Sequence, residues 1–499
     1  MKYINVSWFC LLNCQLSLAQ PMPAREFRGV WIATVANVDF PSQKGLKSKV
    51  QKKEFVNILN KQKENGINAV FFQVRPAADA FYKKSREPWS RWLTGEQGKA
   101  PKPNYDPLLF MIEQSHRRSM EFHAWFNPYR ATFDSVSKIA SNHITQTKPE
   151  WFLTYNGKKL FNPGLPQVRD YLTQVILDVV KNYDIDGVHF DDYFYPYSVA
   201  NDSLRDEKTF RQFNNDFSDR NDWRRNNVNL LIKSLKDSIF AYKPYLKFGV
   251  SPFGVWRNSS QDTLGSDTQA GQTAYDNLYA DVRLWLQNGW IDYVIPQVYF
   301  STAHPKVNYT KLTDWWTKNC FDRHLYIGLG AYKTSRDKDS TWHTGAELGR
   351  QIAFNRTYNQ IQGAVFFSSK TLINNPSHIA DSLRENYFAS PALLPIMAWK
   401  PKINISPPQK IKVKTSKKGI KLSWKNKNAD AKNFVVYRTA LDSGKKILIK
   451  IVASKKRNKL YDQQILPATT YSYTLTGLDR LQNEGTSSPP LLVTSKTSF

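Results

Sequence analysis

Short apolar runs alternate with amphipathic segments along most of the chain. Eight runs rich in β-branched and aromatic residues recur before residue 390, and their near-continuous apolarity is typical of parallel strands buried on both faces. Between them, apolar residues recur at helical spacing. The runs are 28–32, 69–74, 121–126, 187–191, 247–251, 293–298, 325–330 and 363–367, and the predicted helices are 49–65, 168–180, 222–241, 274–288 and 344–359.

Eight strands that are each followed by a helix or a long loop predict an α/β fold, a (β/α)8 TIM barrel with enlarged βα loops. The alternative is a doubly wound open sheet. However, no glycine-rich phosphate loop follows the first predicted strand, as such a sheet would need to bind a dinucleotide. We therefore predict the barrel, over residues 25–390.

The pattern changes after residue 390. Residues 391–408 are rich in proline and predict a linker that wraps on the barrel, and residues 409–499 predict an all-β sandwich. Trp424 and the pair Tyr471 and Tyr473 resemble those of a fibronectin type III module, in which one tyrosine forms a corner. The predicted strands of the sandwich are 411–415, 419–424, 434–437, 447–452, 470–476 and 491–494.

Residues 1–19 predict a signal peptide. Lys2 precedes an apolar stretch at 6–12, and Ser17 and Ala19 form a small-x-small cleavage site. The alternatives are a buried first helix and a lipoprotein, although Cys14 lacks the small residues that a lipoprotein site prefers before it. No later segment approaches the ~20 apolar residues that span a bilayer. We expect an exported protein, periplasmic or extracellular, that does not span a membrane.

Charge distinguishes the two predicted domains. The hydrophobic content of 41% excludes a disordered chain, while the formal net charge of +28 at first suggests a nucleic-acid binder. Residues 401–499 hold 20 Lys and Arg against 5 Asp and Glu, so over half of the excess lies in the predicted sandwich. Export argues against nucleic acid. We instead expect the basic sandwich to contact anionic polymers of the cell envelope.

The carboxyl ends of the predicted strands should carry the chemistry, because barrel active sites are built there. Side chains alternate along a strand, so His189 and Asp191 share the face that points into the barrel, with Asp191 at its mouth. A carboxylate there can attack or stabilise an oxocarbenium-like centre, as glycoside hydrolysis requires. The next residue, Asp192, is either a second carboxylate or a cap for the following loop.

Glycoside hydrolysis needs a second carboxyl group unless the substrate assists. Asp192 is the first candidate for this acid/base and Asp79 the second, with Glu87 in a Trp-rich loop as a further one. Polar and aromatic residues at the other strand ends suit a neutral polyhydroxylated ligand. The predicted substrate-binding residues are Gln73, Arg75, Asn127, Tyr129, His189, Tyr193, Tyr195, Trp256, Gln297 and Tyr299.

Metal and cysteine chemistry have little support in the sequence. Removal of the signal peptide leaves Cys320 as the one cysteine. His123, His189 and Asp191 could together bind a metal, but His123 lies early in its strand, where a core histidine is the favoured interpretation. We expect no metal and no cofactor.

Five segments together resemble the glycosyl-hydrolase-like 10 family. They are 27–35, 71–80, 124–130, 186–196 and 294–299, and they occur in the family's order across residues 25–390. The resemblance implies a TIM-barrel glycosidase exported to the envelope, often with extra modules, in a family with some members active on peptidoglycan glycan strands. The family's fourth-strand aspartates would fall on Asp191 and Asp192.

The sequence therefore predicts an exported glycoside hydrolase that cleaves an amino-sugar polysaccharide, with peptidoglycan glycan strands as the expected substrate. The alternative is a non-catalytic glycan-binding protein of the envelope, in which the barrel cleft holds sugar and the sandwich is a spacer. A cleft with no second carboxyl group near Asp191 would favour this alternative.

Overall fold

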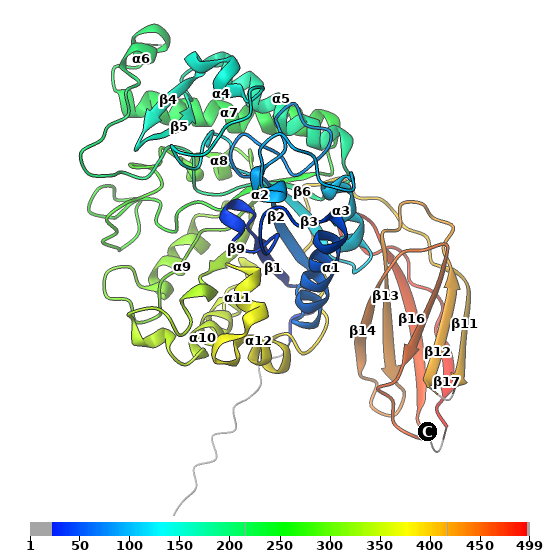
Figure 1. The fold of residues 1–499 in the computed structure, drawn as a ribbon. Helices are drawn as coiled ribbons and strands as arrows, with labels where there is room; N and C mark the ends of the chain where they lie inside the picture. The colour runs from blue at the N-terminus through cyan, green and yellow to red at the C-terminus, as the bar shows by residue number, and fades with distance from the viewer. Residues whose placement is uncertain (1–21, 215, 417, 497–499) are drawn as a thin grey trace, which may run out of the picture.

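The computed structural model describes residues 22–214, 216–416 and 418–496, so the predicted signal peptide, with Cys10 and Cys14, lies outside the described residues. Eight parallel strands close into a barrel (Figure 1), which confirms the predicted fold. Each predicted run overlaps one of them. In barrel order the strands are β1 (Phe27–Ile32), β10 (Ile361–Phe366), β9 (His324–Leu329), β8 (Tyr293–Val294), β7 (Lys247–Val250), β6 (Gly187–Phe190), β3 (Glu121–Phe126) and β2 (Ala69–Arg75).

Helices surround the barrel, and four of the five predicted ones are present. The prediction of a helix over 274–288 is wrong in its first half. Asp281 accepts a hydrogen bond from the Leu284 N–H and caps a shorter helix, and residues 274–281 form turns and irregular chain. The helices are α1 (Ser48–Glu64), α2 (Arg91–Thr94), α3 (Pro107–His116), α4 (Ile144–Thr147), α5 (Pro166–Asn182), α6 (Glu207–Phe213), α7 (Arg220–Tyr242), α8 (Val282–Gln287), α9 (Tyr309–Lys318), α10 (Ala346–Asn355), α11 (Ser369–Asn374) and α12 (Ile379–Ser382).

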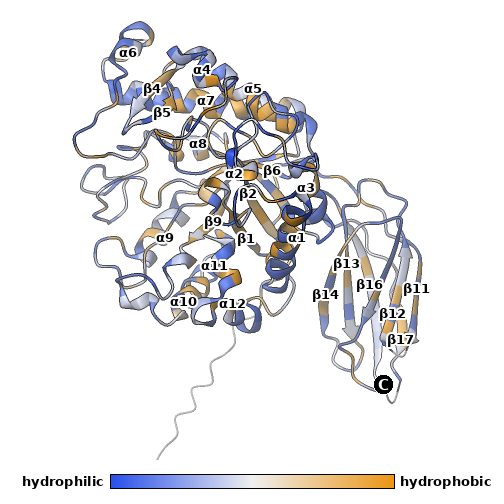
Figure 2. Cartoon of the chain, viewed as in Figure 1, coloured by the Kyte–Doolittle hydropathy of each residue, from blue (hydrophilic) through white to orange (hydrophobic). Residues whose placement is uncertain are grey.

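The barrel interior is filled mainly by aromatic rings. The ring of Phe71 lies 4.6 Å from the rings of both His123 and His189. Glycines make room for these rings: a Cβ at Gly187 would lie 2.2 Å from Nδ1 of His123, and one at Gly249 2.3 Å from the ring of Tyr293. A separate, larger apolar core joins the outward faces of the strands to the helices, and Figure 2 shows apolar residues following the barrel strands.

The long segment after β3 contains a hairpin that the sequence did not predict. It consists of β4 (Phe152–Tyr155) and β5 (Lys158–Phe161). The Phe161 N–H donates to the Tyr129 carbonyl at 2.8 Å, and Arg130 forms a β-bridge with Leu160. The hairpin therefore holds the segment that carries Tyr129 and Arg130 in place, beside the carboxyl ends of the strands.

Two antiparallel sheets form the C-terminal region, as predicted. Trp424 of one sheet packs edge-on against Phe434 of the other, and the Tyr471 hydroxyl accepts a hydrogen bond from the Leu466 N–H at 2.8 Å. The sequence did not predict β15, whose inward positions include Asn458 and Asp462 rather than an apolar run. The sheets are β11 (Gln409–Ser416), β12 (Gly419–Lys425) and β15 (Arg457–Asp462), and β14 (Lys446–Ala453), β13 (Asn433–Ala440), β16 (Thr470–Leu478) and β17 (Leu491–Thr494).

The segment between the two domains crosses the amino ends of the barrel strands. Leu393 pairs with Arg25 just before β1, and the Trp399 indole donates to Asp292 just before β8 at 2.8 Å. From the sandwich, Arg480 forms an ion pair with Asp184, just before β6. The sandwich is thus fastened to the end of the barrel opposite the carboxyl ends of the strands. None of the described helices is both long and apolar enough to cross a membrane.

Candidate active site

A cavity of about 390 Å³ lies at the carboxyl ends of the barrel strands. Its walls combine polar groups with aromatic rings, as expected of a site that binds a polyhydroxylated ligand. The polar lining residues are Gln73, Arg130, Asp191, Asp192, Ser251 and Gln297, and the aromatic ones are Trp31, Trp125, Phe133, Tyr193, Tyr197, Tyr299, Tyr332 and Phe367.

Asp191 follows β6 directly and is held by three donors. Its Oδ2 accepts from the Asn127 side-chain amide at 2.5 Å and from the Trp125 indole at 3.2 Å, while Oδ1 accepts from the Tyr193 N–H at 3.1 Å. Burial, followed by the negative charge of Asp192, raises the pKa of Asp191 to about 6. The carboxyl group is therefore fixed in orientation and titrates close to neutral pH.

Gln73 fixes the side-chain amide of Asn127 in the orientation that Asp191 requires. Its Oε1 accepts from the backbone N–H groups of Thr34 and Val35, each at 2.9 Å. Its Nε2 must then donate, and it reaches the Asn127 Oδ1 at 2.6 Å. This leaves the Asn127 Nδ2 to face Asp191. A chain of hydrogen bonds thus runs from the backbone after β1, through β2 and β3, to the carboxylate after β6.

Asp192 lines the same cavity, and its side chain is buried like that of Asp191. Its Oδ2 accepts a hydrogen bond from the Tyr197 hydroxyl. Burial raises the pKa of Asp192, and the side chains of Tyr197 and Gln297 lower it. The guanidinium of Arg130 lies 4.3 Å from the centre of the Tyr193 ring and lowers the pKa of both aspartates. Two adjacent carboxyl groups with raised pKa values therefore face one cavity.

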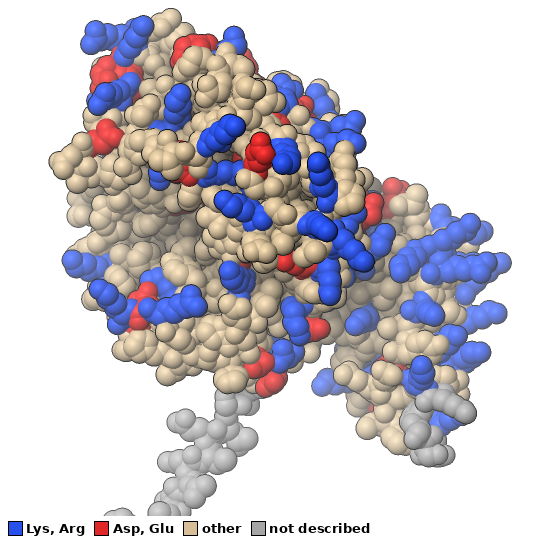
Figure 3. Space-filling model, in the orientation of Figure 1, with Lys and Arg blue, Asp and Glu red and all other residues tan. Residues whose placement is uncertain are grey.

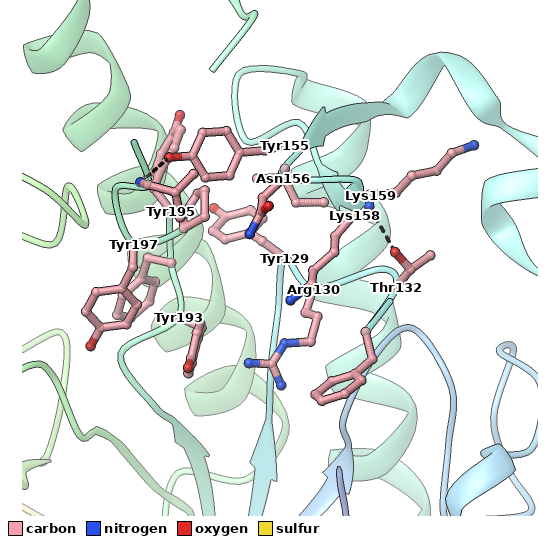
Figure 4. A pocket seen from close by; sticks show the side chains of 15 residues that line it. Tyr129, Arg130, Thr132, Tyr155, Asn156, Lys158, Lys159, Tyr193, Tyr195 and Tyr197 are labelled. Carbon is pink, nitrogen blue, oxygen red and sulfur yellow. Dashed lines mark hydrogen bonds between the residues drawn. The ribbon is translucent and has the colours of Figure 1, made fainter. Parts of the chain in front are cut away.

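A second cavity of about 270 Å³ adjoins the first (Figure 4). The two cavities share Arg130, Phe133, Tyr193 and Tyr197 as lining residues. The β4–β5 hairpin forms one wall of the second cavity, and the segment after β6 forms another. We refer to these two adjoining cavities over the barrel mouth together as the cleft.

The structure brings most of the predicted site residues to this cleft. Both fourth-strand aspartates and several predicted substrate-binding residues line the first cavity, and three predicted tyrosines line the second, one of which also lines the first. Asn127 lies behind the wall, where it touches Asp191 and Gln73. The lining residues are Gln73, Asp191, Asp192, Tyr193, Gln297 and Tyr299 in the first cavity, and Tyr129, Tyr193 and Tyr195 in the second.

Three predicted substrate-binding residues lie outside the cleft. Arg75 is buried and forms a two-pronged ion pair with Glu87, at 2.6 and 2.7 Å, so both side chains are occupied. Trp256 stacks on Trp315, with ring centres 5.9 Å apart. His189 lies in the barrel interior, where its Nε2 accepts from the Trp31 indole at 3.2 Å and burial holds its pKa well below the usual value.

Asp79, the second candidate for the acid/base, does not line either cavity of the cleft. It is buried beneath the loop that carries Gln97, whose amide donates to its Oδ2 at 3.3 Å. Burial raises the pKa of Asp79 to about 7. Among the carboxyl groups that the sequence proposed for the acid/base, Asp192 is the one that shares the cavity with Asp191.

Sequence reasoning missed several residues of the cleft. Trp125 precedes Asn127 by two positions and so shares its side of the chain, a signal that could have identified it. Arg130 and Tyr197 come from loops, where no periodicity shows which way a side chain points. Trp31, Phe133, Tyr332 and Phe367 were also missed, and they complete the aromatic wall.

Comparisons with known proteins identify similar chains by sequence. A sequence profile described as "Glycosyl hydrolase-like 10" matches residues 26–344. The chain is 43% identical over 481 residues to "Glycosyl hydrolase YngK" of Bacillus subtilis, covering 94% of each. It is 37% identical over 383 residues to "Glycosyl hydrolase DigH" of Escherichia coli K12, covering 72% of this chain and 85% of the relative.

Among solved structures, the PgaB (BpsB) glycoside hydrolase domain from Bordetella bronchiseptica is similar, with 13% sequence identity and a TM-score of 0.46. The similarity covers 73% of this chain and 99% of that domain.

Proposed function

Because the chain belongs to the glycosyl hydrolase-like 10 family, we propose that it is an exported glycoside hydrolase that acts on an amino-sugar polysaccharide, the glycan strands of peptidoglycan. The observation that carries this proposal is the pair Asp191 and Asp192, two buried carboxyl groups that face one aromatic-walled cavity. Glycoside hydrolysis requires such a pair, one group to donate a proton and one to stabilise the positive charge at the anomeric carbon.

The surroundings of the two aspartates support different roles. Asp191 receives three hydrogen bonds, which favour its ionised form, so its negative charge faces the oxocarbenium-like centre. Asp192 faces the same cavity as Asp191, so we assign it the transfer of a proton to the departing glycosidic oxygen. Gln73 and Asn127 act as positioning residues that hold Asp191 in place.

The proposed substrate is tested by mass spectrometry of the soluble products. Purified peptidoglycan freed of its peptides and neutral amino-sugar polymers are incubated with the full chain. Release of new oligosaccharides from peptidoglycan supports the proposal. If every substrate remains intact while the protein still binds glycan, the chain is a non-catalytic glycan-binding protein instead.

Activity should depend on pH as a bell-shaped curve. As pH falls through about 6, Asp191 is protonated and can no longer stabilise positive charge, so the rate falls. As pH rises further, both coupled carboxyl groups are ionised, so no proton remains for the departing glycosidic oxygen and the rate falls again. Asn127→Ala removes a donor to ionised Asp191. We therefore expect the acidic limb to move to higher pH and kcat/KM at pH 5 to fall about tenfold.

This shift is measured from kcat/KM profiles between pH 4 and 9. Asn60→Ala, which removes an exposed amide of α1, serves as the control and should leave the profile unchanged. An acidic limb that stays in place in Asn127→Ala would show that Asp191 does not set it.

The positive charge of the sandwich supports a role in holding the protein at the cell envelope rather than in catalysis. The outer face of the sheet β11–β12–β15 carries six cations and no carboxylate at the positions paired across its strands (Figure 3). We call it the cationic face, and we propose that it holds the enzyme against anionic envelope polymers. Its cations are Lys412, Lys414, Lys421, Lys425, Arg457 and Lys459.

Replacing four lysines of the cationic face by glutamine should weaken association with purified cell walls and make it less sensitive to salt. The turnover of short soluble oligosaccharides should not change, because the sandwich is fastened to the far end of the barrel from the cleft. Wall association that is unaffected would refute the proposed role. The substituted residues are Lys412, Lys414, Lys421 and Lys459, and the control replaces the exposed barrel lysines Lys53, Lys208, Lys233 and Lys318.

A further inference from the structure

The second cavity of the cleft is a positively charged chamber beside the two aspartates. It measures about 270 Å³, near the lower limit of ligand pockets at roughly 300 Å³, so its size suits one sugar unit rather than a chain. Because it shares four lining residues with the first cavity, a glycan bound across Asp191 and Asp192 would place a neighbouring sugar in it.

Arg130 and Lys158 give this chamber its charge. Figure 4 shows both side chains pointing into the space between Tyr129 and Tyr193, whereas that of Lys159 points away. The Lys158 Nζ lies 5.7 Å from the centre of the Phe133 ring. None of the described residues that line the chamber is Asp or Glu, and within the described chain neither Arg130 nor Lys158 forms an ion pair.

The two cations have different relations to the catalytic pair. Arg130 lies between the cavities and lowers the pKa of both Asp191 and Asp192, so part of its charge is balanced by them. Lys158 is an exposed residue of β5 in the hairpin, and its ammonium group points into the chamber near Phe133, which both cavities share. A neutral sugar there would leave the ammonium group without a counter-charge, whereas a carboxylate would form a charge-assisted hydrogen bond with it.

We propose that this chamber is a subsite for a sugar that carries a carboxylate, bound next to the sugar held at Asp191 and Asp192. Tyrosine rings would contact the faces of the sugar, and Lys158 and Arg130 would pair with its carboxylate. The proposal rests on the proposed hydrolase function and adds to it a subsite that recognises the carboxylate of an acidic sugar. The carboxylate could belong to a lactyl ether, as in muramic acid, or to a hexuronic acid.

The test measures binding to the full-length Asp191→Asn variant by calorimetry, so that turnover does not interfere. Three tetrasaccharides are compared: one of N-acetylglucosamine alone, one alternating N-acetylglucosamine with N-acetylmuramic acid, and one alternating N-acetylglucosamine with glucuronic acid. We expect at least one acidic tetrasaccharide to bind about tenfold more tightly than the neutral one, as one charge-assisted hydrogen bond would provide. The acidic sugar that binds more tightly identifies the source of the carboxylate. Equal affinity for all three would overturn the proposal.

Two variants, Lys158→Gln and Lys148→Gln, show whether a preference for acidic sugar comes from the proposed subsite or from the positive charge of the protein in general. Lys148 is an exposed lysine between α4 and the β4–β5 hairpin, and it does not line the cleft. We expect Lys158→Gln to remove the preference for the acidic sugar and Lys148→Gln to keep it. A preference that survives in Lys158→Gln would overturn the assignment of Lys158.

The unmodified protein is assayed for hydrolysis of the same three tetrasaccharides. If it cleaves the neutral one but binding shows no acidic preference, the subsite fails and the hydrolase function stands. If it cleaves none while the acidic preference depends on Lys158, the hydrolase function fails and the subsite stands.

Discussion

Asp191→Asn should lower the release of reducing ends from glycan by about 10³-fold or more, while the affinity for glycan stays nearly unchanged. The amide has almost the shape of the carboxylate, so its oxygen can still accept from the Asn127 amide and the Trp125 indole. It cannot supply the negative charge that an oxocarbenium-like centre requires. Reducing-end release and calorimetric affinity are measured on the same preparation.

Thermal unfolding provides the control for this variant. If the midpoint of thermal unfolding is close to that of the unmodified protein, the variant is folded and the loss of reducing-end release is a loss of catalysis. The neutral amide avoids the burial penalty of the ionised carboxyl group, although its Nδ2 then faces the Tyr193 N–H donor, so we expect at most a small loss of stability. Undiminished reducing-end release from Asp191→Asn would remove Asp191 from the mechanism and would leave the glycan-binding alternative stronger.

The position of Asp191 at the mouth of the barrel follows from the sequence because two simple regularities meet there. A buried parallel strand is almost wholly apolar, so 187–190 identifies β6, and barrel geometry then places the residue after it at the mouth of the barrel. Both features are local in the chain. The eight strands of the barrel were predictable for the same reason, and the glycosyl-hydrolase-like 10 resemblance is confirmed by the family match.

Arg75 illustrates what strand position alone does not reveal. It ends β2, where an arginine that binds substrate would also lie, but Glu87 comes back twelve residues later to neutralise it. Trp256 likewise follows a barrel strand and stacks on Trp315 from α9 instead of facing the cleft. In both cases a partner far along the chain or in a loop decides the role, and no periodicity encodes that pairing.

The β4–β5 hairpin, by contrast, is an element that contributes to the cleft but was not predicted from the sequence. Its short strands carry exposed polar residues such as Lys158, so they lack the continuous apolarity by which the barrel strands were found. The hairpin is stable because it pairs with the backbone of Tyr129 and Arg130. The proposed acidic subsite depends on Lys158 of this hairpin. The residues at the barrel strand ends do not include it, and they therefore suggested a neutral ligand.

Asp192→Asn should lower kcat on peptidoglycan glycan by about 10²- to 10⁴-fold, the contribution typical of general acid catalysis. The departing sugar is a poor leaving group and needs a proton, which we propose that Asp192 donates. The dinitrophenolate of a 2,4-dinitrophenyl glycoside is a stable anion that leaves without a proton, so cleavage of this substrate should fall far less in the same variant. Asp191→Asn, by contrast, should impair both substrates, since both develop positive charge at the anomeric carbon.

The leaving-group comparison also distinguishes Asp192 from Asp79. Asp79→Asn is the matched control, because this carboxyl group is also buried and has a raised pKa, yet it lines neither cavity of the cleft. If Asp192 is the acid, Asp79→Asn keeps nearly full activity on both substrates. If Asp79→Asn instead loses activity on glycan and keeps it on the dinitrophenyl glycoside, the proton comes from Asp79. The cleft would then have to rearrange on binding, since a general acid must reach the glycosidic oxygen to protonate it.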